Sequence, residues 1–162
     1  MSEQLTNLVE LLKNRSLTIS VAESCTGGNL SALLTSISGS SSYFNRGYIT
    51  YSDKSKIDML GVNLSTINEF GAVSEQTAIE MSRGLIDCSL SEVGVAVTGI
   101  AGPTGGTKEK PVGTVCFSFC ILENCFSLTK HFNGDRNQVV HHSVNFVIET
   151  LINELSRQHE QK

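Results

Sequence analysis

The sequence lacks any concentration of basic residues, and this absence argues against a nucleic-acid partner. Its 12 Lys and Arg residues are outnumbered by 16 Asp and Glu residues, which gives a formal net charge of −4. Proteins that bind nucleic acid neutralise phosphates with clustered Lys and Arg side chains, and no segment here gathers them into a stripe. A small anionic ligand stays compatible with the composition, because a few cations and backbone N–H groups hold a single phosphate.

The sequence also lacks a long apolar run. Crossing a bilayer takes roughly 20 consecutive apolar residues, and no segment approaches that length, so no membrane partner is expected. Residues 1–15 place Glu3, Glu10 and Lys13 among the leucines, whereas a signal peptide has an uninterrupted apolar centre.

Paired cysteine spacings are missing as well. The five cysteines are an odd number and include no C-x-x-C pair. Disulfide frameworks and zinc sites normally show even numbers or short paired spacings. We therefore expect reduced thiols, a cytoplasmic location and no bound metal.

What is present is an alternation of helical and strand-like segments. The chain has 162 residues, 40% of them hydrophobic, which suits one domain over residues 1–162. Alternation followed by a hairpin predicts an α/β fold, a mixed sheet with helices on both faces. The patterns predict helices near residues 5–12, 28–37, 53–60 (capped by Asp53), 64–70, 75–86 (capped by Ser74) and 136–155, and strands near residues 17–22, 43–51, 93–97, 112–122 and 125–132.

A serine follows the first predicted strand. Ser24 is followed by Thr26, Gly27 and Gly28 where a helix is expected to begin, and ligands of α/β proteins bind beyond the carboxyl ends of strands. N–H groups of such a turn could stabilise the oxyanion that forms when a serine attacks a carbonyl. The alternative is that Ser24 or Thr26 only caps the helix. Cys25 is a rival nucleophile, although buried thiols are usually inert.

A serine nucleophile needs a base. The four histidines show no spacing typical of a triad or metal site. A lysine kept neutral by burial is another kind of base, and Lys54 and Lys56 both follow the strand that ends near Tyr51. The alternative for each lysine is a solvated side chain.

Two further segments have features of a binding site. The glycine-rich loop over residues 98–111 contains Gly102, Gly105 and Gly106; it is long for a compact domain and rich in N–H groups that could hold a phosphate or ribose. Asp135 can cap the last predicted helix, and Arg136 then lies at its start, where a cation is electrostatically unfavourable. An anionic ligand facing Arg136 would explain that position, and a solvated arginine is the alternative.

Taken together and in order, these segments resemble the CinA C-terminal domain family, whose standalone members are nicotinamide-nucleotide amidohydrolases. The resemblance covers about residues 5–155. It rests on the ordered segments Ala22–Gly28 (AESCTGG), Gly39–Ser41 (GSS), Arg46–Ser52 (RGYITYS), Gly71–Glu75 (GAVSE), Thr98–Gly106 (TGIAGPTGG), Lys110–Val115 (KPVGTV) and Gly134–Arg136 (GDR).

The resemblance implies a three-layer α/β/α sandwich that forms a homodimer. It implies hydrolysis of nicotinamide mononucleotide to nicotinic acid mononucleotide and ammonia, in NAD recycling, without a cofactor. In that family the serine of the first motif is the nucleophile, which corresponds to Ser24. The lysine after T-Y-S is the base, which corresponds to Lys56 with Lys54 as competitor. Tyr51 assists, and Arg136 is expected near the active site.

Two other functions stay compatible with the sequence. The chain could be a non-catalytic module that binds or senses a pyridine nucleotide, or a hydrolase of another small amide. Ammonia release measured beside binding, over a panel of amides, separates these possibilities.

Overall fold

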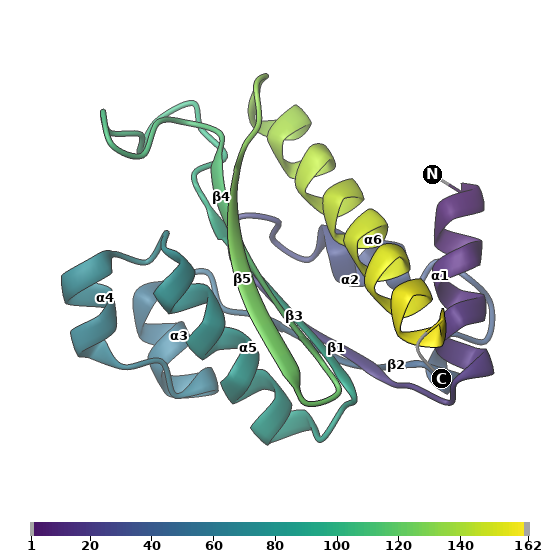
Figure 1. Ribbon diagram of the computed structural model, residues 1–162. Coiled ribbons are helices and arrows are strands. Elements are labelled where there is room, and N and C mark those ends of the chain that lie inside the picture. Colours follow the sequence, from purple (N-terminus) through teal and green to yellow (C-terminus); the bar gives the residue numbers. More distant parts are fainter. Residues whose placement is uncertain (1, 161–162) are drawn as a thin grey trace.

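The computed structural model describes residues 2–160 and shows one five-stranded sheet between two layers of helices (Figure 1). The elements of this part of the chain are α1 (Ser2–Asn14), β1 (Ile19–Glu23), α2 (Asn29–Leu34), the 3-10 helix η1 (Ser40–Ser42), β2 (Phe44–Ile49), α3 (Asp53–Leu60), α4 (Leu64–Phe70), α5 (Glu75–Ser89), β3 (Val93–Gly99), β4 (Thr114–Ile121), β5 (Asn124–His131) and α6 (Arg136–Glu160).

The sheet is mixed, with the strand order β2-β1-β3-β4-β5. β1 runs parallel to both of its neighbours, β2 and β3. β4 and β5 continue the sheet as an antiparallel hairpin. Helices α1, α2 and α6 cover one face, and α3, α4 and α5 cover the other (Figure 1). The predicted mixed sheet with helices on both faces is confirmed.

Alternate side chains of the sheet build a core on each face. On the α1–α2–α6 face, Ile19, Val21 and Phe117 are fully buried in the larger apolar cluster. On the other face, Ala22 and Ala96 pack in a smaller cluster with side chains of α3, α4 and α5. The central strands are therefore buried on both faces, as parallel strands between helical layers are.

Helix caps agree with the predictions at one position and differ at another. Ser74 caps α5, because its side chain accepts a hydrogen bond from the Thr77 N–H. Asp53 was expected to cap α3, but the cap is Ser52, which accepts from the Ser55 N–H, and Asp53 is the first helical residue. The hydroxyl of Ser52 precedes the first turn, where a cap must lie.

The turn of the hairpin lies one residue earlier than expected. Ile121 pairs with Asn124, so Leu122 and Glu123 form the turn in place of Glu123 and Asn124. Leu122 takes a left-handed backbone conformation there (φ 56°). No Gly or Asn marks that conformation in the sequence, and this is why the pattern misplaced the turn.

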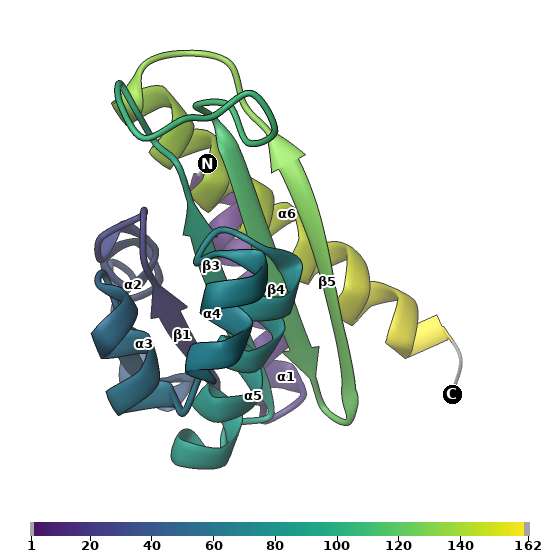
Figure 2. The same cartoon turned by 90° about the vertical axis from the view of Figure 1, so that its left-hand side faces the viewer.

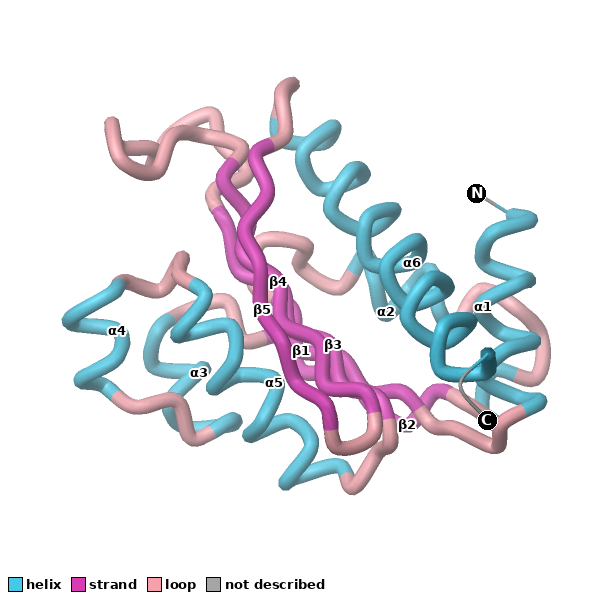
Figure 3. The backbone as a smooth tube through the Cα atoms, in the orientation of Figure 1, coloured by secondary structure: helices cyan, strands magenta, loops and turns pink. Residues whose placement is uncertain are grey.

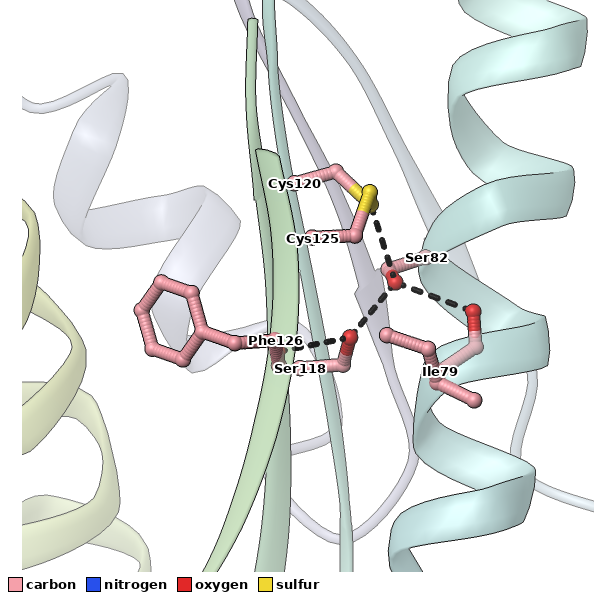
Figure 4. The surroundings of a disulfide bond; sticks show 6 residues. All are labelled: Ile79, Ser82, Ser118, Cys120, Cys125 and Phe126. Carbon is pink, nitrogen blue, oxygen red and sulfur yellow. Dashed lines mark hydrogen bonds between the residues drawn. A yellow bond between two sulfur atoms is a disulfide. The ribbon is translucent and has the colours of Figure 1, made fainter. Parts of the chain in front are cut away.

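The expectation that all cysteines are reduced was wrong. Cys120 and Cys125 form a disulfide between β4 and β5, where the two residues face each other in the strand register. Both side chains point toward α5, where Ser82 lies between the sulfur of Cys120 and the hydroxyl of Ser118 (Figure 4). The hairpin brings the two thiols together, and spacing motifs do not encode that proximity.

Several connections gather at one end of the sheet. The long connection between β3 and β4 and the connection from β5 to α6 both lie there (Figure 2). Pink loops extend from this end beyond β4 and β5 (Figure 3). Within residues 2–160, no helix combines the length and apolar character that crossing a membrane requires.

Candidate active site

Ser24 lies at the carboxyl end of the central parallel strand. It directly follows β1, and its N–H donates to the Val97 carbonyl of β3 (2.9 Å). The connection after β1 goes to one face of the sheet as α2, and the connection after β2 goes to the other as α3. Such a divergence opens a crevice between the two strand ends, the usual place of a ligand in an α/β sheet.

The turn after Ser24 needs its glycines. Gly27 and Gly28 both have left-handed backbone conformations (φ 55° and 102°), which side chains with a Cβ disfavour. The N–H of Gly27 donates to the Ser24 carbonyl (3.0 Å). It is therefore engaged in closing the turn, contrary to the expectation that it faces an oxyanion.

Glu23 holds this turn in place, a role that the sequence did not indicate. Its carboxylate, fully buried, accepts hydrogen bonds from the N–H groups of Leu30 and Ser31 (both 2.9 Å) and from the Ser31 hydroxyl (2.7 Å). The last residue of β1 thus accepts the hydrogen bonds of two N–H groups in the first turn of α2. The only signal available was an acidic residue a few positions before a helix start.

Lys56 reaches Ser24 from the next crossover. It lies in α3 with 1% of its surface exposed, and its Nζ lies 3.1 Å from the Ser24 Oγ, although 32 residues separate the two in sequence. The same Nζ donates to the carbonyls of Thr50 (2.9 Å) and Tyr51 (3.3 Å). Three oxygen atoms therefore surround one buried amine.

Burial lowers the pKa of Lys56 below its usual 10.5, against the opposing effect of the Asp53 carboxylate. A neutral amine has two N–H bonds and one lone pair. If the neutral amine donates its two N–H bonds to the Thr50 and Tyr51 carbonyls, its lone pair faces the Ser24 Oγ. This arrangement suits a base that removes the proton of the serine.

The competing candidates, Lys54 and Cys25, are less suited to these roles. Lys54 is exposed and pairs with Asp58 on the surface of α3. Burial raises the pKa of the Cys25 thiol to about 12. Since the thiolate is the nucleophilic form, Cys25 is a poor rival to Ser24.

Arg136 joins three segments at the edge of this crevice. It is the first residue of α6, and its guanidinium donates to the Tyr51 hydroxyl (2.7 Å) and to the Gly102 carbonyl (2.9 Å). Asp135 caps the helix by accepting from the Gln138 N–H (2.9 Å), as expected. The guanidinium thereby links the glycine-rich loop to the end of the β2 segment.

A pocket of about 260 Å³ opens beside the serine and the lysine; we call it the Ser24–Lys56 pocket. Tyr51, Gly102, Gly105 and Arg136 also line it. The other expected site residues do not line this pocket. Thr26 and Gly27 line a neighbouring hollow, and Gly28 directly precedes α2. Gly106 packs against the backbone of Val112, so closely that an added Cβ would be 2.6 Å from the Val112 nitrogen.

Residues 2–155 match the sequence profile of the CinA C-terminal domain. A CinA-like protein of Geotalea daltonii is 50% identical over 129 residues, which are 80% of this chain and 31% of that protein. The chain thus spans about a third of the length of the first curated relatives that it matches.

Shorter relatives match over most of their own length. The nicotinamide-nucleotide amidohydrolase PncC of Enterobacter agglomerans is 43% identical over 144 residues, 88% of each chain. The crystal structure of a CinA superfamily protein from Klebsiella pneumoniae superposes with a TM-score of 0.92 at 34% identity, over 96% of this chain and 97% of that one.

Proposed function

The chain belongs to the CinA C-terminal domain family, and from this premise we propose that it hydrolyses the carboxamide of nicotinamide mononucleotide to nicotinic acid mononucleotide and ammonia. Relatives named nicotinamide-nucleotide amidohydrolase align with 88% of the chain and with 87–88% of their own length, which supports this substrate. The reaction belongs to pyridine-nucleotide recycling. The homodimer and the cytoplasmic location remain predictions.

The observation that carries the proposal is the 3.1 Å approach of the buried Lys56 Nζ to the Ser24 Oγ. Neutral Lys56 takes the hydroxyl proton while Ser24 Oγ attacks the carboxamide carbon. The tetrahedral oxyanion that forms is stabilised by backbone N–H groups of the turn after Ser24. Gly27 contributes to this turn by closing it, since its own N–H is bonded to the Ser24 carbonyl.

The same lysine completes the first half of the reaction. As an ammonium it donates its proton to the departing nitrogen, so that ammonia leaves and an ester of Ser24 remains. Water then attacks the ester carbon, with the neutral amine accepting a proton of that water. The resulting ammonium returns this proton to the departing Ser24 Oγ, and the carboxylic acid that forms releases its own proton to solvent. The products are the carboxylate of nicotinic acid mononucleotide and the regenerated serine, and no redox partner or metal is required by the balance.

Tyr51 and Arg136 have supporting roles in this scheme. The Tyr51 hydroxyl is fixed by Arg136, and the Tyr51 carbonyl accepts from Lys56. We assign Tyr51 to orienting the lysine and the substrate. Arg136 holds charged parts of the nucleotide, and the loop at Gly102 and Gly105, which lines the Ser24–Lys56 pocket, encloses its reacting end.

Substitution of each member of the pair tests the proposal. Ser24→Ala and Lys56→Met should each lower ammonia release from nicotinamide mononucleotide by at least about a hundredfold, since a positioned base alone contributes 10²–10⁴. Lys54→Met is the matched control, because it removes a lysine two positions away that is exposed, and it should retain activity. Circular dichroism verifies that each variant is folded.

Two results would overturn the assignment. Full activity of either Ser24→Ala or Lys56→Met would reject the catalytic pair. A wild-type chain that binds the nucleotide tightly but releases no ammonia would instead be a binding or sensing module.

A further inference from the structure

A second hollow adjoins the Ser24–Lys56 pocket. It measures about 690 Å³ and lies between the start of α2 and the first three turns of α6; we call it the α2–α6 hollow. Cys25, Tyr51 and Arg136 line both spaces. A ligand that occupied both spaces would pass these three residues, beside the Tyr51–Arg136 hydrogen bond.

The size of the Ser24–Lys56 pocket favours such an extension. Pockets that enclose a whole drug-sized ligand measure roughly 300–1,000 Å³, and this pocket measures about 260 Å³. It has room for a carboxamide ring, but a mononucleotide also carries a ribose and a phosphate. These groups need a neighbouring space.

The charges around the α2–α6 hollow suit an anion. Among the described residues that line it there is no Asp or Glu, whereas the chain as a whole carries a net charge of −4. Arg136, His141, Asn137 and Asn29 line it, and the first two turns of α6 bring the positive end of a 25-residue helix to it.

Neighbouring spaces are less suitable for a phosphate. Asp53 is one of the residues that line the Ser24–Lys56 pocket. The hollow on the other side of the α6 start contains Asp135. Repulsion between like charges disfavours a phosphate at either position.

Building on the proposed function, we propose that the α2–α6 hollow binds the phosphorylated ribose of the substrate, with the phosphate facing Arg136, Asn137 and His141. The carboxamide ring then occupies the Ser24–Lys56 pocket. The two spaces divide the nucleotide into a reacting end and a recognition end. This division would let the protein distinguish a nucleotide from its dephosphorylated nucleoside.

The test measures binding in a chain that does not turn the substrate over. Ser24→Ala is titrated calorimetrically with nicotinamide mononucleotide and with nicotinamide riboside, which lacks only the phosphate. Adding His141→Glu should weaken the binding of the mononucleotide roughly tenfold through like-charge repulsion and leave the binding of the riboside unchanged. His142→Glu is the matched control, because it makes the same charge change on the adjacent residue, which does not line the hollow.

A second substitution separates binding from folding. Asn137→Asp adds a carboxylate to the first turn of α6, where a negative charge stabilises a helix. The same substitution should weaken the binding of the mononucleotide but not that of the riboside. Asn133→Asp, on an exposed residue before the helix, is its control. Stability and phosphate affinity are therefore expected to change in opposite directions.

The outcomes bear separately on the two proposals. Equal effects on mononucleotide and riboside, or equal effects of His141→Glu and His142→Glu, would overturn the assignment of the hollow. Because binding is measured without hydrolysis, a wild-type chain that releases no ammonia would refute the proposed reaction but would not alter this result.

Discussion

At Lys56, burial and hydrogen bonding act on the protonation of one amine in opposite directions. Burial lowers the pKa of the amine, because the ammonium is poorly solvated there. The Thr50 and Tyr51 carbonyls are good acceptors for an ammonium. The net direction is a lowered pKa, and this increases the fraction of the neutral base at a given pH.

The first prediction concerns the pH dependence of ammonia release. The rate should rise with pH and level off above the pKa of Lys56, which lies below 10.5. The Asp53 carboxylate raises this pKa by favouring the ammonium. Asp53→Asn should therefore shift the rising limb of the plot of kcat/KM against pH to lower pH. The measurement is kcat/KM for ammonia release across the neutral and alkaline range.

The control for this shift is Asp58→Asn. Asp58 is a carboxylate of the same helix that pairs with the exposed Lys54, so its removal should leave the limb in place. A limb that stays fixed or moves to higher pH in Asp53→Asn would show that another group controls the profile.

The choice between Lys54 and Lys56 shows what sequence spacing leaves undetermined. Both lysines follow the same strand, and residues two apart on a helix point in nearly opposite directions. The helical phase that directs Lys56 inward depends on where α3 begins. The cap proved to be Ser52 and not Asp53, so the phase could not be fixed from the sequence.

Between β1 and α2, the Glu23 carboxylate determines the shape of the turn that presents Ser24. Gly28 precedes α2 and offers no side-chain cap. The carboxylate of the preceding strand supplies the missing acceptors for the N–H groups of Leu30 and Ser31. The geometry of Ser24 therefore depends on a residue that lines neither the Ser24–Lys56 pocket nor the α2–α6 hollow.

The second prediction is that Glu23→Gln lowers kcat more than it changes KM. The amide replaces one acceptor oxygen by a donor, which leaves a helix N–H unsatisfied at a cost of about 1–3 kcal/mol. Activity should fall at least about tenfold as Ser24 moves away from Lys56. Ammonia-release kinetics and thermal unfolding measure the two effects.

Ser31→Ala is the matched variant for Glu23. It removes the hydroxyl bond to the carboxylate and keeps both backbone bonds, so it should cost about 0.5–1.5 kcal/mol and little activity. If Ser31→Ala and Glu23→Gln reduce kcat equally, the carboxylate has no special positioning role.

Over the whole molecule, the disulfide and the candidate site lie toward different ends of the sheet. The Ser24 N–H is hydrogen-bonded to the Val97 carbonyl, near the end of β3. Cys120 pairs in the sheet with Gly94, near the start of β3. The bridge therefore fixes the hairpin without contacting the residues around Lys56. Stability and activity should respond to it separately.

The third prediction follows from this separation. Cys125→Ser should lower the free energy of unfolding by about 2 kcal/mol, because the bridge closes only a short loop, and should leave kcat/KM unchanged. Cys88→Ser removes an exposed free thiol and is the control. Equal losses of stability and activity in Cys125→Ser would contradict the separation, as measured by denaturant unfolding and ammonia release.

The layers of the fold were predictable, because periodic apolar residues report which faces are buried. The strands and their order in the chain were found from β-branched runs, and the helices from spacings such as Leu8 and Leu12. Contacts between distant segments were not encoded locally. The bonds of Arg136 to Tyr51 and Gly102 and the pairing of Cys120 with Cys125 depend on how the sheet brings separate loops together.

The position of β2 at the edge of the sheet has a consequence for catalysis near denaturing conditions. β2 is bonded to a strand on one side only, and it leads into the segment that carries Lys56. Outer strands open by partial fluctuations that need less energy than global unfolding. Mild denaturant should therefore abolish the proposed ammonia release by moving Lys56 away from Ser24, while β1 and β3 remain protected from hydrogen exchange.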